Sequence, residues 1–267
     1  MTPDDIALIR RCAESSRAAA RKLAATDAAT RTRALEAIAK ALEAREARVL
    51  AANALDLHAA AAAGLSTAMQ DRLRLDAARF HALVAAVRAV NALLDPLGDV
   101  EWQPPRADGL EIGHLRAPLG AIAMIYESRP NVTVDAAVLS LKSGNAVALR
   151  GGREAAHSNA ALIGAVQAGL RDAGLPPEAA VLVPVFERAA IAELLKHDDC
   201  LALVIPRGGE GLIRFVAEVS RVPVIRHYKG VCHLYVEASA DLDAALRLAI
   251  DGKCARPSAC NALETLL

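Results

Sequence analysis

Between residues 120 and 227, short apolar runs alternate with segments that have the periodicity of amphipathic helices. The apolar runs are GAIAMIY, AVALR, AVLVPV, CLALVIP and VPVIRH. The helical segments between them are NVTVDAAVLSLK, residues 153–173, residues 189–197 and GLIRFVAEVS. Strands joined by helices of this length lie parallel, with helices on both faces of the sheet. The alternation therefore predicts an α/β fold with a Rossmann-type parallel sheet.

The first hundred residues are rich in alanine and predict a layer of helices. Thr2 can cap the first helix, with Pro3 at its first position and two aspartates in its first turn. A second helix is expected from about Thr30 into the fifties, where apolar residues form one stripe. A further helix is expected from Phe80 to Leu94, because apolar residues recur there at intervals of three and four until a proline ends it.

The segment EWQPPRADGLEIGHL follows these helices and has a different character. It contains two adjacent prolines and an Asp108-Gly109 turn signal, after which Leu110 and Ile112 alternate with polar residues. Extended stretches joined by such a turn are typical of a hairpin. The sequence predicts a hairpin or extended arm between about residues 100 and 117.

Charge and cysteine content exclude several classes of protein. The chain has 31 basic and 31 acidic side chains, and only 3% of its residues are aromatic, so neither a positive field nor a stacking platform favours nucleic acid. The acidic start and the lack of a long apolar run predict a cytoplasmic protein without membrane contact. Five cysteines without zinc-ligand spacing predict neither a disulfide framework nor a metal site.

Two glycine-containing loops lie between a predicted strand and a predicted helix. Such loops can present backbone N–H groups and a helix N-terminus to phosphate. Neither loop matches G-x-G-x-x-G or a P-loop, so the alternative is that the glycines only make turns. In the first loop the candidate residues are Arg207, Gly208, Gly209 and Gly211. In the second they are Arg150, Gly151 and Gly152, with Arg153 also placed to face a phosphate.

The segment IYESRPNVTVDA follows the first central strand. Arg129 precedes a proline and is biased toward extended geometry, and Asn131 can cap the next helix. Capping is the simpler role of Asn131. The alternative is that Asn131 acts as an amide donor, and Arg129 as an anion clamp, at the carboxyl end of the strand.

Cys260 lies in RPSACNA, with Arg256 four residues before it and Asn261 directly after it. Pro257-Ser258 is a helix-start signal, which would place Cys260 in a first helical turn, where a thiolate is favoured. A buried structural thiol is the alternative. The other cysteines lack such a context, and the histidines show no ligand spacing.

Four long segments in order carry a resemblance to a known family: PLGAIAMIYESRPNVTVDAAVLSLKSGNAVALRGGREA, LVIPRGGEGLI, HYKGVCHLYVE and RPSACNALETLL. With them, the chain resembles the gamma-glutamyl phosphate reductases of the aldehyde dehydrogenase superfamily. The resemblance implies an NADP-binding domain with N-terminal helices over residues 1–250, whose arm near 100–117 serves oligomerisation. It also implies that residues 251–267 begin a catalytic domain that is truncated here.

The resemblance further implies a reaction. The family reduces L-glutamate 5-phosphate with NADPH to L-glutamate 5-semialdehyde and phosphate, in proline biosynthesis. Cys260 would be the nucleophile that forms a thioester, and Asn131 would supply an oxyanion donor. Arg150 would lie on the adenosine ribose side of the cofactor, and the PRGGEG glycines on its pyrophosphate side. Arg129 and Asn261 are the expected substrate contacts.

The family pattern also bears on partners and on rival functions. It implies a homo-oligomer that takes its substrate from glutamate 5-kinase. The stretch HYKGVCHLYV lacks the glutamate that activates water in hydrolytic relatives, as expected when phosphate rather than water exchanges with the thioester. Two alternatives remain open: a nucleotide-binding fragment without catalysis, and an acyl-CoA-linked aldehyde dehydrogenase of the same superfamily.

Overall fold

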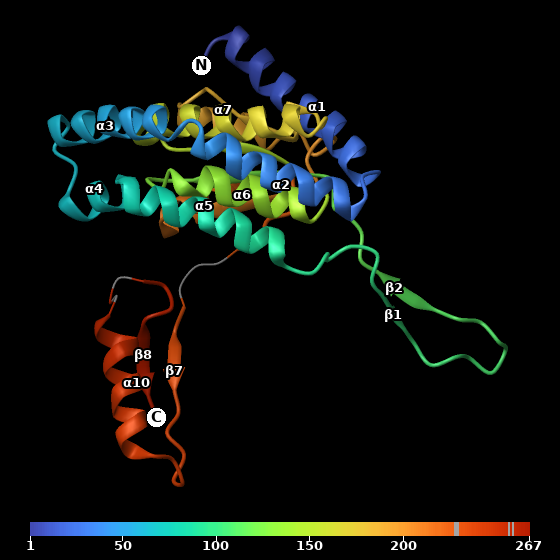
Figure 1. The fold of residues 1–267 in the computed structure, drawn as a ribbon, viewed down its shortest axis with the longest axis vertical. Helices are drawn as coiled ribbons and strands as arrows, with labels where there is room; N and C mark the ends of the chain where they lie inside the picture. The colour runs from blue at the N-terminus through green and yellow to red at the C-terminus, as the bar shows by residue number, and fades with distance from the viewer. Residues whose placement is uncertain (227–229, 256, 258) are drawn as a thin grey trace. The chain divides into compact units, whose positions relative to one another are not determined.

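The computed structural model describes residues 1–226, 230–255, 257 and 259–267, and Figure 1 gives the order of the elements. The chain divides into two compact units, Met1–Ile225 and Arg226–Leu267. The division falls earlier in the chain than the boundary predicted after residue 250. We therefore describe each unit by itself.

The centre of the first unit is a sheet of four parallel strands in the order β5-β4-β3-β6. Strands β3 and β4 are buried almost throughout, which explains why they are apolar runs without alternation. The predicted parallel sheet is confirmed, although VPVIRH contributes only a single bridge from Val224 to Val204. The strands are β3 (Ala121–Tyr126), β4 (Ala146–Arg150), β5 (Ala180–Leu182) and β6 (Leu203–Arg207).

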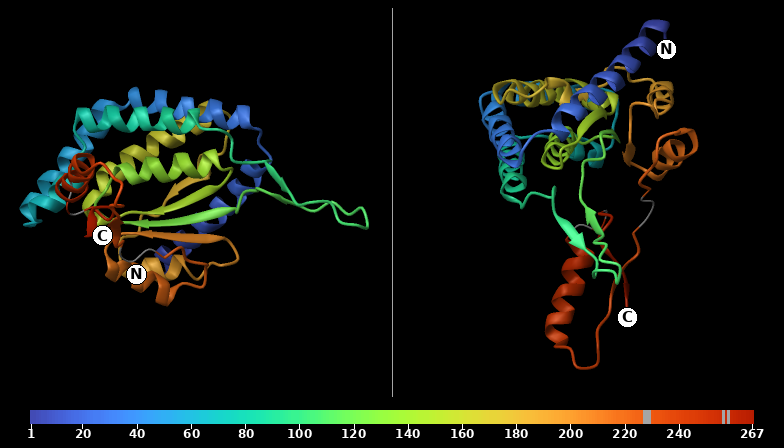
Figure 2. Two further views of the ribbon diagram at one scale, coloured as in Figure 1. Left: turned by 90° about the horizontal axis from the view of Figure 1, so that it is seen from below. Right: turned by 90° about the vertical axis from the view of Figure 1, so that its right-hand side faces the viewer.

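Helices cover both faces of this sheet, as Figure 2 (left) shows. One face is covered by α6 (Asn131–Lys142) and α7 (Ala156–Asp172). On the other lie α1 (Pro3–Ala24), α8 (Arg188–Leu194) and α9 (Glu210–Val219). Short 3-10 turns at Arg153–Ala155 and Pro177–Ala179 precede α7 and β5. The chain is thus wound around the sheet in both directions.

The N-terminal helices form the predicted outer layer, over α6 and α7. This layer consists of α2 (Ala28–Glu43), α3 (Glu46–Ala62) and α5 (Ala77–Ala92), with a short α4 (Thr67–Leu73) between the last two. The single helix expected from Thr30 is therefore two helices. Thr2 caps α1 within a capping box, as predicted. A Cβ at Gly169 would lie 2.5 Å from the Cα of Ile38, so α7 needs this glycine to contact α2.

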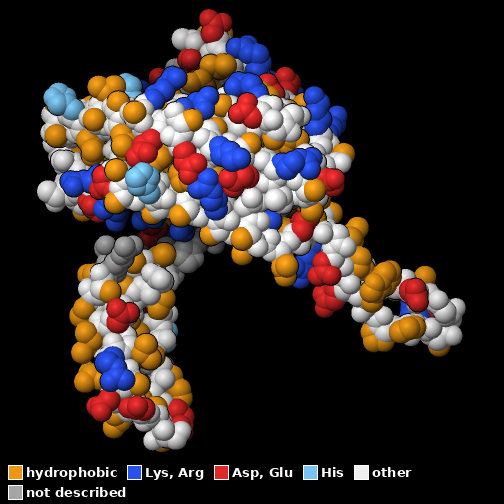
Figure 3. Space-filling view, viewed as in Figure 1, with side chains coloured by type: hydrophobic (Ala, Val, Ile, Leu, Met, Phe, Trp, Pro, Cys, Tyr) orange, Lys and Arg blue, Asp and Glu red, His pale blue; other side chains and the backbone are white. Residues whose placement is uncertain are grey.

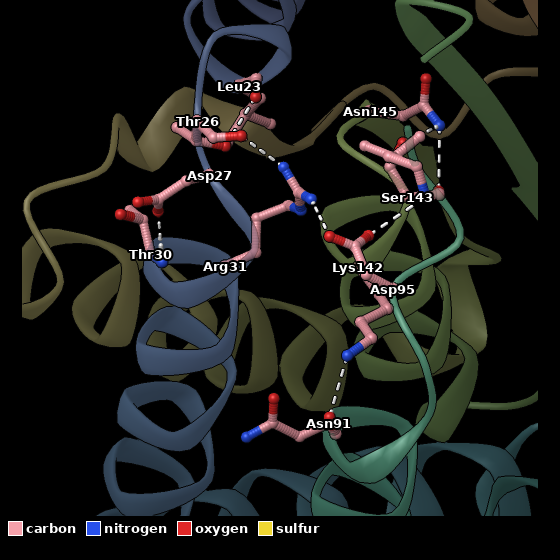
Figure 4. Close-up of polar contacts among 11 residues, drawn as sticks. Leu23, Thr26, Asp27, Thr30, Arg31, Asn91, Asp95, Lys142, Ser143 and Asn145 are labelled. Carbon is pink, nitrogen blue, oxygen red and sulfur yellow. Dashed lines mark hydrogen bonds and ion pairs between the residues drawn. The ribbon is translucent and has the colours of Figure 1, made fainter. Parts of the chain in front are cut away.

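Buried polar contacts fix the segment that leaves α5 (Figure 4). The Arg31 guanidinium donates to the Thr26 carbonyl and to Asp95 Oδ2, each at 2.5 Å. Lys142 Nζ at the end of α6 donates to the Asn91 carbonyl at 2.9 Å. The Lys142 contact joins the outer helical layer to the inner one, and the Arg31 contacts hold the start of α2 against the segment after α5. The face of the molecule drawn in Figure 3 carries basic and acidic side chains interspersed, as expected from the balanced composition.

The predicted hairpin is confirmed. Strands β1 (Val100–Trp102) and β2 (Gly113–Leu115) pair antiparallel. Gly109, at the expected turn, has a φ of +81°, which a glycine adopts without strain. The hairpin exposes large apolar side chains: Trp102 is 63% accessible and Leu115 is 62% accessible.

The second unit contains two parallel strands, β7 (Cys232–Leu234) and β8 (Leu263–Leu266), with α10 (Leu242–Cys254) between them in the chain. The prediction that Cys260 lies in a helix is wrong. Residues 259–262 form turns, and the following residues pair with β7 as a strand. Ser258, on which part of that prediction rested, lies outside the described residues, as do Arg256 and residues 227–229.

Candidate functional site

The carboxyl edge of the parallel sheet contains the topological switch point of the first unit. From β3 the chain continues to its neighbour β4 and then to β5, whereas β6 pairs with β3 on the opposite side. Connections that leave two adjacent strands toward opposite faces open a crevice at their carboxyl ends, where open α/β sheets bind ligands. The segments that follow β3, β4 and β6 here are the three that the sequence singled out.

The glycine loop after β6 contacts the residue that follows β3. Glu127 N donates to the Arg207 carbonyl at 3.3 Å, and Gly209 N donates to Glu127 Oε2 at 3.0 Å. A Cβ at Gly208 would lie 2.4 Å from the same carboxylate oxygen, so a side chain at this position would displace the Glu127 carboxylate. Gly209 is the N-cap of α9, and Gly211 in its first turn faces open space. The loop thus has the expected location, but a carboxylate already accepts one of its N–H groups.

Arg150 ends β4 and is buried. Its guanidinium donates to the carbonyl of Phe186 and, at 3.4 Å, to that of Glu187, while its Nε has no partner among the described residues. Burial lowers the pKa of Arg150, an effect opposed by the nearby carboxylates of Glu154, Glu127 and Glu187. Arg150 therefore ties the loop after β5 to the end of β4.

The glycines that follow Arg150 are required by packing. A Cβ at Gly151 would lie 2.3 Å from the Asn159 amide nitrogen and 3.0 Å from the Tyr126 hydroxyl. A Cβ at Gly152 would lie 2.2 Å from the Glu154 carboxylate. Arg153 is exposed, with Glu187 at 3.9 Å as its ion-pair partner.

Ser128 forms an unusual turn beside the crevice. It is the one non-glycine residue of the described ranges in the left-handed region, with a φ of 48°. Its N and Oγ both donate to Glu154 Oε1, at 2.7 and 2.8 Å. This interaction holds the chain between β3 and α6 against the loop after β4. The sequence analysis missed both residues, because no local pattern predicts a bond across 26 positions.

A cavity of about 340 Å³ brings together three of the predicted residues: Arg129, Asn131 and Arg207. Apolar side chains of α5 and α6 form most of its remaining lining, with Asp135 as a further polar residue. The expectation that Asn131 caps α6 is wrong, because Pro130 is the N-cap and Asn131 is the first helical residue. Its Nδ2 instead donates to Asp135 Oδ2 at 2.8 Å.

Asp135 was not foreseen, and its environment is distinctive. Burial raises the pKa of the Asp135 carboxyl, and the hydrogen bond from Asn131 partly opposes that rise. The contact fixes the Asn131 amide at the cavity wall. The i, i+4 spacing on one helix is the sequence signal that would have found it.

In the second unit, Cys260 and Asn261 are both exposed. The Cys232 thiol donates to the Cys260 carbonyl, with 3.7 Å between sulfur and oxygen. A Cβ at Gly230 would lie 2.5 Å from that carbonyl oxygen, so Gly230 allows the two backbones to approach. Cys260 therefore lies in a turn that contacts Gly230 and Cys232, at the start of β7, and it does not lie in a helix.

The described ranges contain no group of three or more His, Cys, Asp or Glu side chains arranged to hold a metal ion. Within the same ranges, no helix combines the length and apolarity needed to span a bilayer.

The sequence model of the aldehyde dehydrogenase family matches residues 4–265. The chain belongs to that family. Among family members, gamma-glutamyl phosphate reductase of Xanthomonas campestris pv. campestris is 54% identical over 97% of this chain, and that of Xylella fastidiosa (strain 9a5c) is also 54% identical over 97%. The chain spans 63% and 62% of the length of these two relatives.

Solved structures agree with the family assignment. Gamma-glutamyl phosphate reductase of Thermotoga maritima matches with a TM-score of 0.90 at 38% identity, over 97% of this chain and 62% of that one. The Saccharomyces cerevisiae protein of the same name gives 0.76 at 31% identity, over 97% and 65%. The predicted aldehyde dehydrogenase fold and the resemblance to gamma-glutamyl phosphate reductases are confirmed.

Proposed function

We propose that this chain is the cofactor-binding part and nucleophile segment of an NADP-dependent glutamate-5-semialdehyde dehydrogenase. The reaction is the reduction of L-glutamate 5-phosphate to L-glutamate 5-semialdehyde with release of phosphate, in proline biosynthesis. The observation that carries this proposal is the identity of 54% to 59% with proteins named gamma-glutamyl phosphate reductase. The crevice at the switch point of the sheet gives it a physical site.

A nicotinamide dinucleotide fits the carboxyl edge of the first unit. Gly208, Gly209 and Gly211 would face its pyrophosphate, since the loop lacks side chains and leads into the N-terminus of α9. Arg150, whose buried Nε has no partner among the described residues, would lie on the ribose side with Gly151 and Gly152. NADPH, when bound, supplies the hydride.

Cys260 is the proposed nucleophile. Its thiolate attacks the acyl carbon of the substrate, the carbon–oxygen bond to phosphate breaks, and a thioester remains. Reduction of the thioester gives a thiohemiacetal, which collapses to the aldehyde and the free thiol. The stretch HYKGVCHLYV offers no glutamate to activate water, which favours this outcome over hydrolysis.

Asn131 is the proposed oxyanion donor. An asparagine amide has two hydrogens, and Asp135 accepts one of them, which leaves the second for a developing oxyanion. Arg129 in the same cavity would bind an anionic group of the substrate, as would Asn261 beside the nucleophile.

The exposed apolar hairpin between residues 100 and 117 supports a homo-oligomer in which this arm contacts a second copy. We further propose that the enzyme is cytoplasmic and receives its labile substrate from glutamate 5-kinase.

The experiment that tests the function is phosphate-dependent reduction of NADP by glutamate 5-semialdehyde, the reverse reaction. It is measured on this chain continued to the length of its relatives. Cys260→Ser is expected to lower turnover at least 10³-fold, whereas Cys254→Ser leaves it within about twofold. Equal turnover in wild type and Cys260→Ser would contradict the mechanism.

The same assay separates the rival functions. Dependence on coenzyme A instead of phosphate would identify an acyl-CoA-linked enzyme. Calorimetry of the 267-residue chain with NADPH tests the second alternative, a nucleotide-binding module without catalysis. Binding there, combined with no turnover by the continued chain, would identify a nucleotide-binding module.

A further inference from the structure

The carboxylate of Glu127 accepts a hydrogen bond from the glycine loop that follows β6. Gly209 N, at the N-terminus of α9, donates to Glu127 Oε2 at 3.0 Å. This N–H belongs to the glycine loop that the proposed function assigns to pyrophosphate. A carboxylate and a phosphate oxygen are both anionic acceptors, so they compete for the same donor.

Two further features show that this contact is built into the fold. Glu127 N donates to the Arg207 carbonyl, so the backbones of the two segments continue the pairing of β3 with β6 beyond the sheet. Gly208 lacks the Cβ that would otherwise lie 2.4 Å from the carboxylate. Gly208 therefore leaves room for the Glu127 carboxylate beside the loop.

We propose that Glu127 is an internal competitor of the cofactor phosphates, which holds the glycine loop in order and limits the affinity of the enzyme for NADPH. This inference rests on the proposed function, because it needs the cofactor at this loop. On binding, the cofactor takes over the Gly209 N–H, and the Glu127 carboxylate gives up that hydrogen bond. The charge of Glu127 then remains next to the phosphates and weakens their binding.

The decisive variant is Glu127→Gln. Glutamine has the same shape and its Oε1 still accepts from Gly209 N, so the loop keeps its order while the negative charge is lost. Two like charges about 4 Å apart that are both well exposed to water repel enough to change an affinity about fivefold. We expect Glu127→Gln to lower the Kd for NADPH by that factor, and to lower the Kd for inorganic pyrophosphate in the same direction.

The experiment is calorimetry of the 267-residue chain and its variants with NADPH and with pyrophosphate. Glu178→Gln is the matched control, because Glu178 is an exposed glutamate in the 3-10 turn before β5, at the amino end of that strand. Its Kd values should equal those of the wild type. Thermal unfolding of each variant reports whether the loop stays ordered.

Each outcome has one meaning. Tighter binding of both ligands by Glu127→Gln, with an unchanged melting temperature, supports the competitor. Unchanged or weaker binding by a folded Glu127→Gln overturns it. If the wild type binds neither ligand, the proposed function has failed instead, and with it the premise of this inference.

Discussion

At Gly208 and Gly230, a Cβ would come very close to atoms of residues that lie far away in sequence. Gly208 is confined by the Glu127 carboxylate, and Gly230 by the carbonyl oxygen of Cys260. The sequence analysis singled out Gly208 as a ligand contact and did not single out Gly230. A local pattern shows that a glycine is present, but only the fold shows which atom excludes a side chain.

Gly230→Ala is expected to lower turnover at least tenfold in the chain continued to the length of its relatives. The new Cβ would lie 2.5 Å from a backbone atom, which cannot rotate away, so the turn that holds Cys260 must shift. A displacement of about 1 Å at a nucleophile can cost up to 10²-fold in rate.

Gly252→Ala in α10 is the control for that prediction. Its Cβ would meet only the Leu263 side chain, at an ordinary contact distance of 3.5 Å. Turnover and stability should therefore stay close to those of the wild type. Equal turnover in both glycine variants would contradict the role assigned to Gly230.

Asp135→Asn is expected to increase the stability of the protein at neutral pH. Burial raises the pKa of Asp135, so the folded state holds this proton to higher pH than the unfolded state does. Stability therefore falls as pH rises through the interval from the ordinary aspartate value, about 3.9, to the raised one.

The substitution removes this penalty, because asparagine carries no charge and still offers an acceptor to Asn131. Urea denaturation at several pH values checks the prediction. The gain should be present at pH 7 and absent below about pH 3.9. A gain that is the same at both ends of the range would show that the charge of Asp135 is not its source.

At the scale of elements, the N-termini of two helices differ in how far the sequence predicts them. The cap of α1 is local, since Thr2 and Asp5 form a reciprocal box three residues apart. The N-terminus of α7 has no side-chain cap of its own. Asp56 of α3 accepts from the backbone N–H groups of His157 and Ser158 instead, at 3.1 and 2.7 Å. Packing between helices supplies this cap, so a local reading could not find it.

Asp56→Ala is expected to destabilise the chain by about 3 kcal/mol, because it leaves buried donors without an acceptor. Asp56 is only 2% accessible and also accepts from the His157 ring and the Ser158 hydroxyl. Asp76→Ala, which removes the local cap of α5, should cost only about 1 kcal/mol. Urea denaturation of both variants gives the comparison, and equal losses would contradict the buried cap.

At β8, local signals predicted the wrong type of element. The start signal at Pro257-Ser258 predicted a helix through Cys260, yet Leu263–Leu266 pair in parallel with β7. The partner strand lies on the other side of α10 in the chain, so long-range pairing overrides the local preference. The break between α2 and α3 was missed for a related reason, since Ala44 and Arg45 carry no glycine or proline signal.

On the scale of the whole molecule, the alternation of apolar and helical segments was sufficient to predict the parallel sheet. Three of its four strands fall within a predicted run, β6 extends one residue beyond its run, and the three candidate loops follow β3, β4 and β6. What the sequence could not provide is the set of contacts between those loops. Glu127 with Gly209, and Ser128 with Glu154, depend on the strand order, which no local pattern encodes.

The hairpin gives a prediction at this scale. Trp102→Glu is expected to dissociate the proposed homo-oligomer into monomers, because it puts a charge into the apolar surface of the arm. Leu94→Glu is the control, since Leu94 is 93% accessible and lies outside the hairpin. Sedimentation velocity measures the mass of each variant, and an unchanged oligomer in Trp102→Glu would exclude the arm from the interface.

The division of the chain after Ile225 has a consequence for its synthesis. A ribosome that has released residues 1–225 has delivered every strand and helix of the first unit, so the switch-point crevice can form while translation continues. The turn that holds Cys260 depends on β7 and on β8, and β8 emerges only after the cysteine itself. The order of translation therefore provides the switch-point crevice first and the proposed nucleophile later.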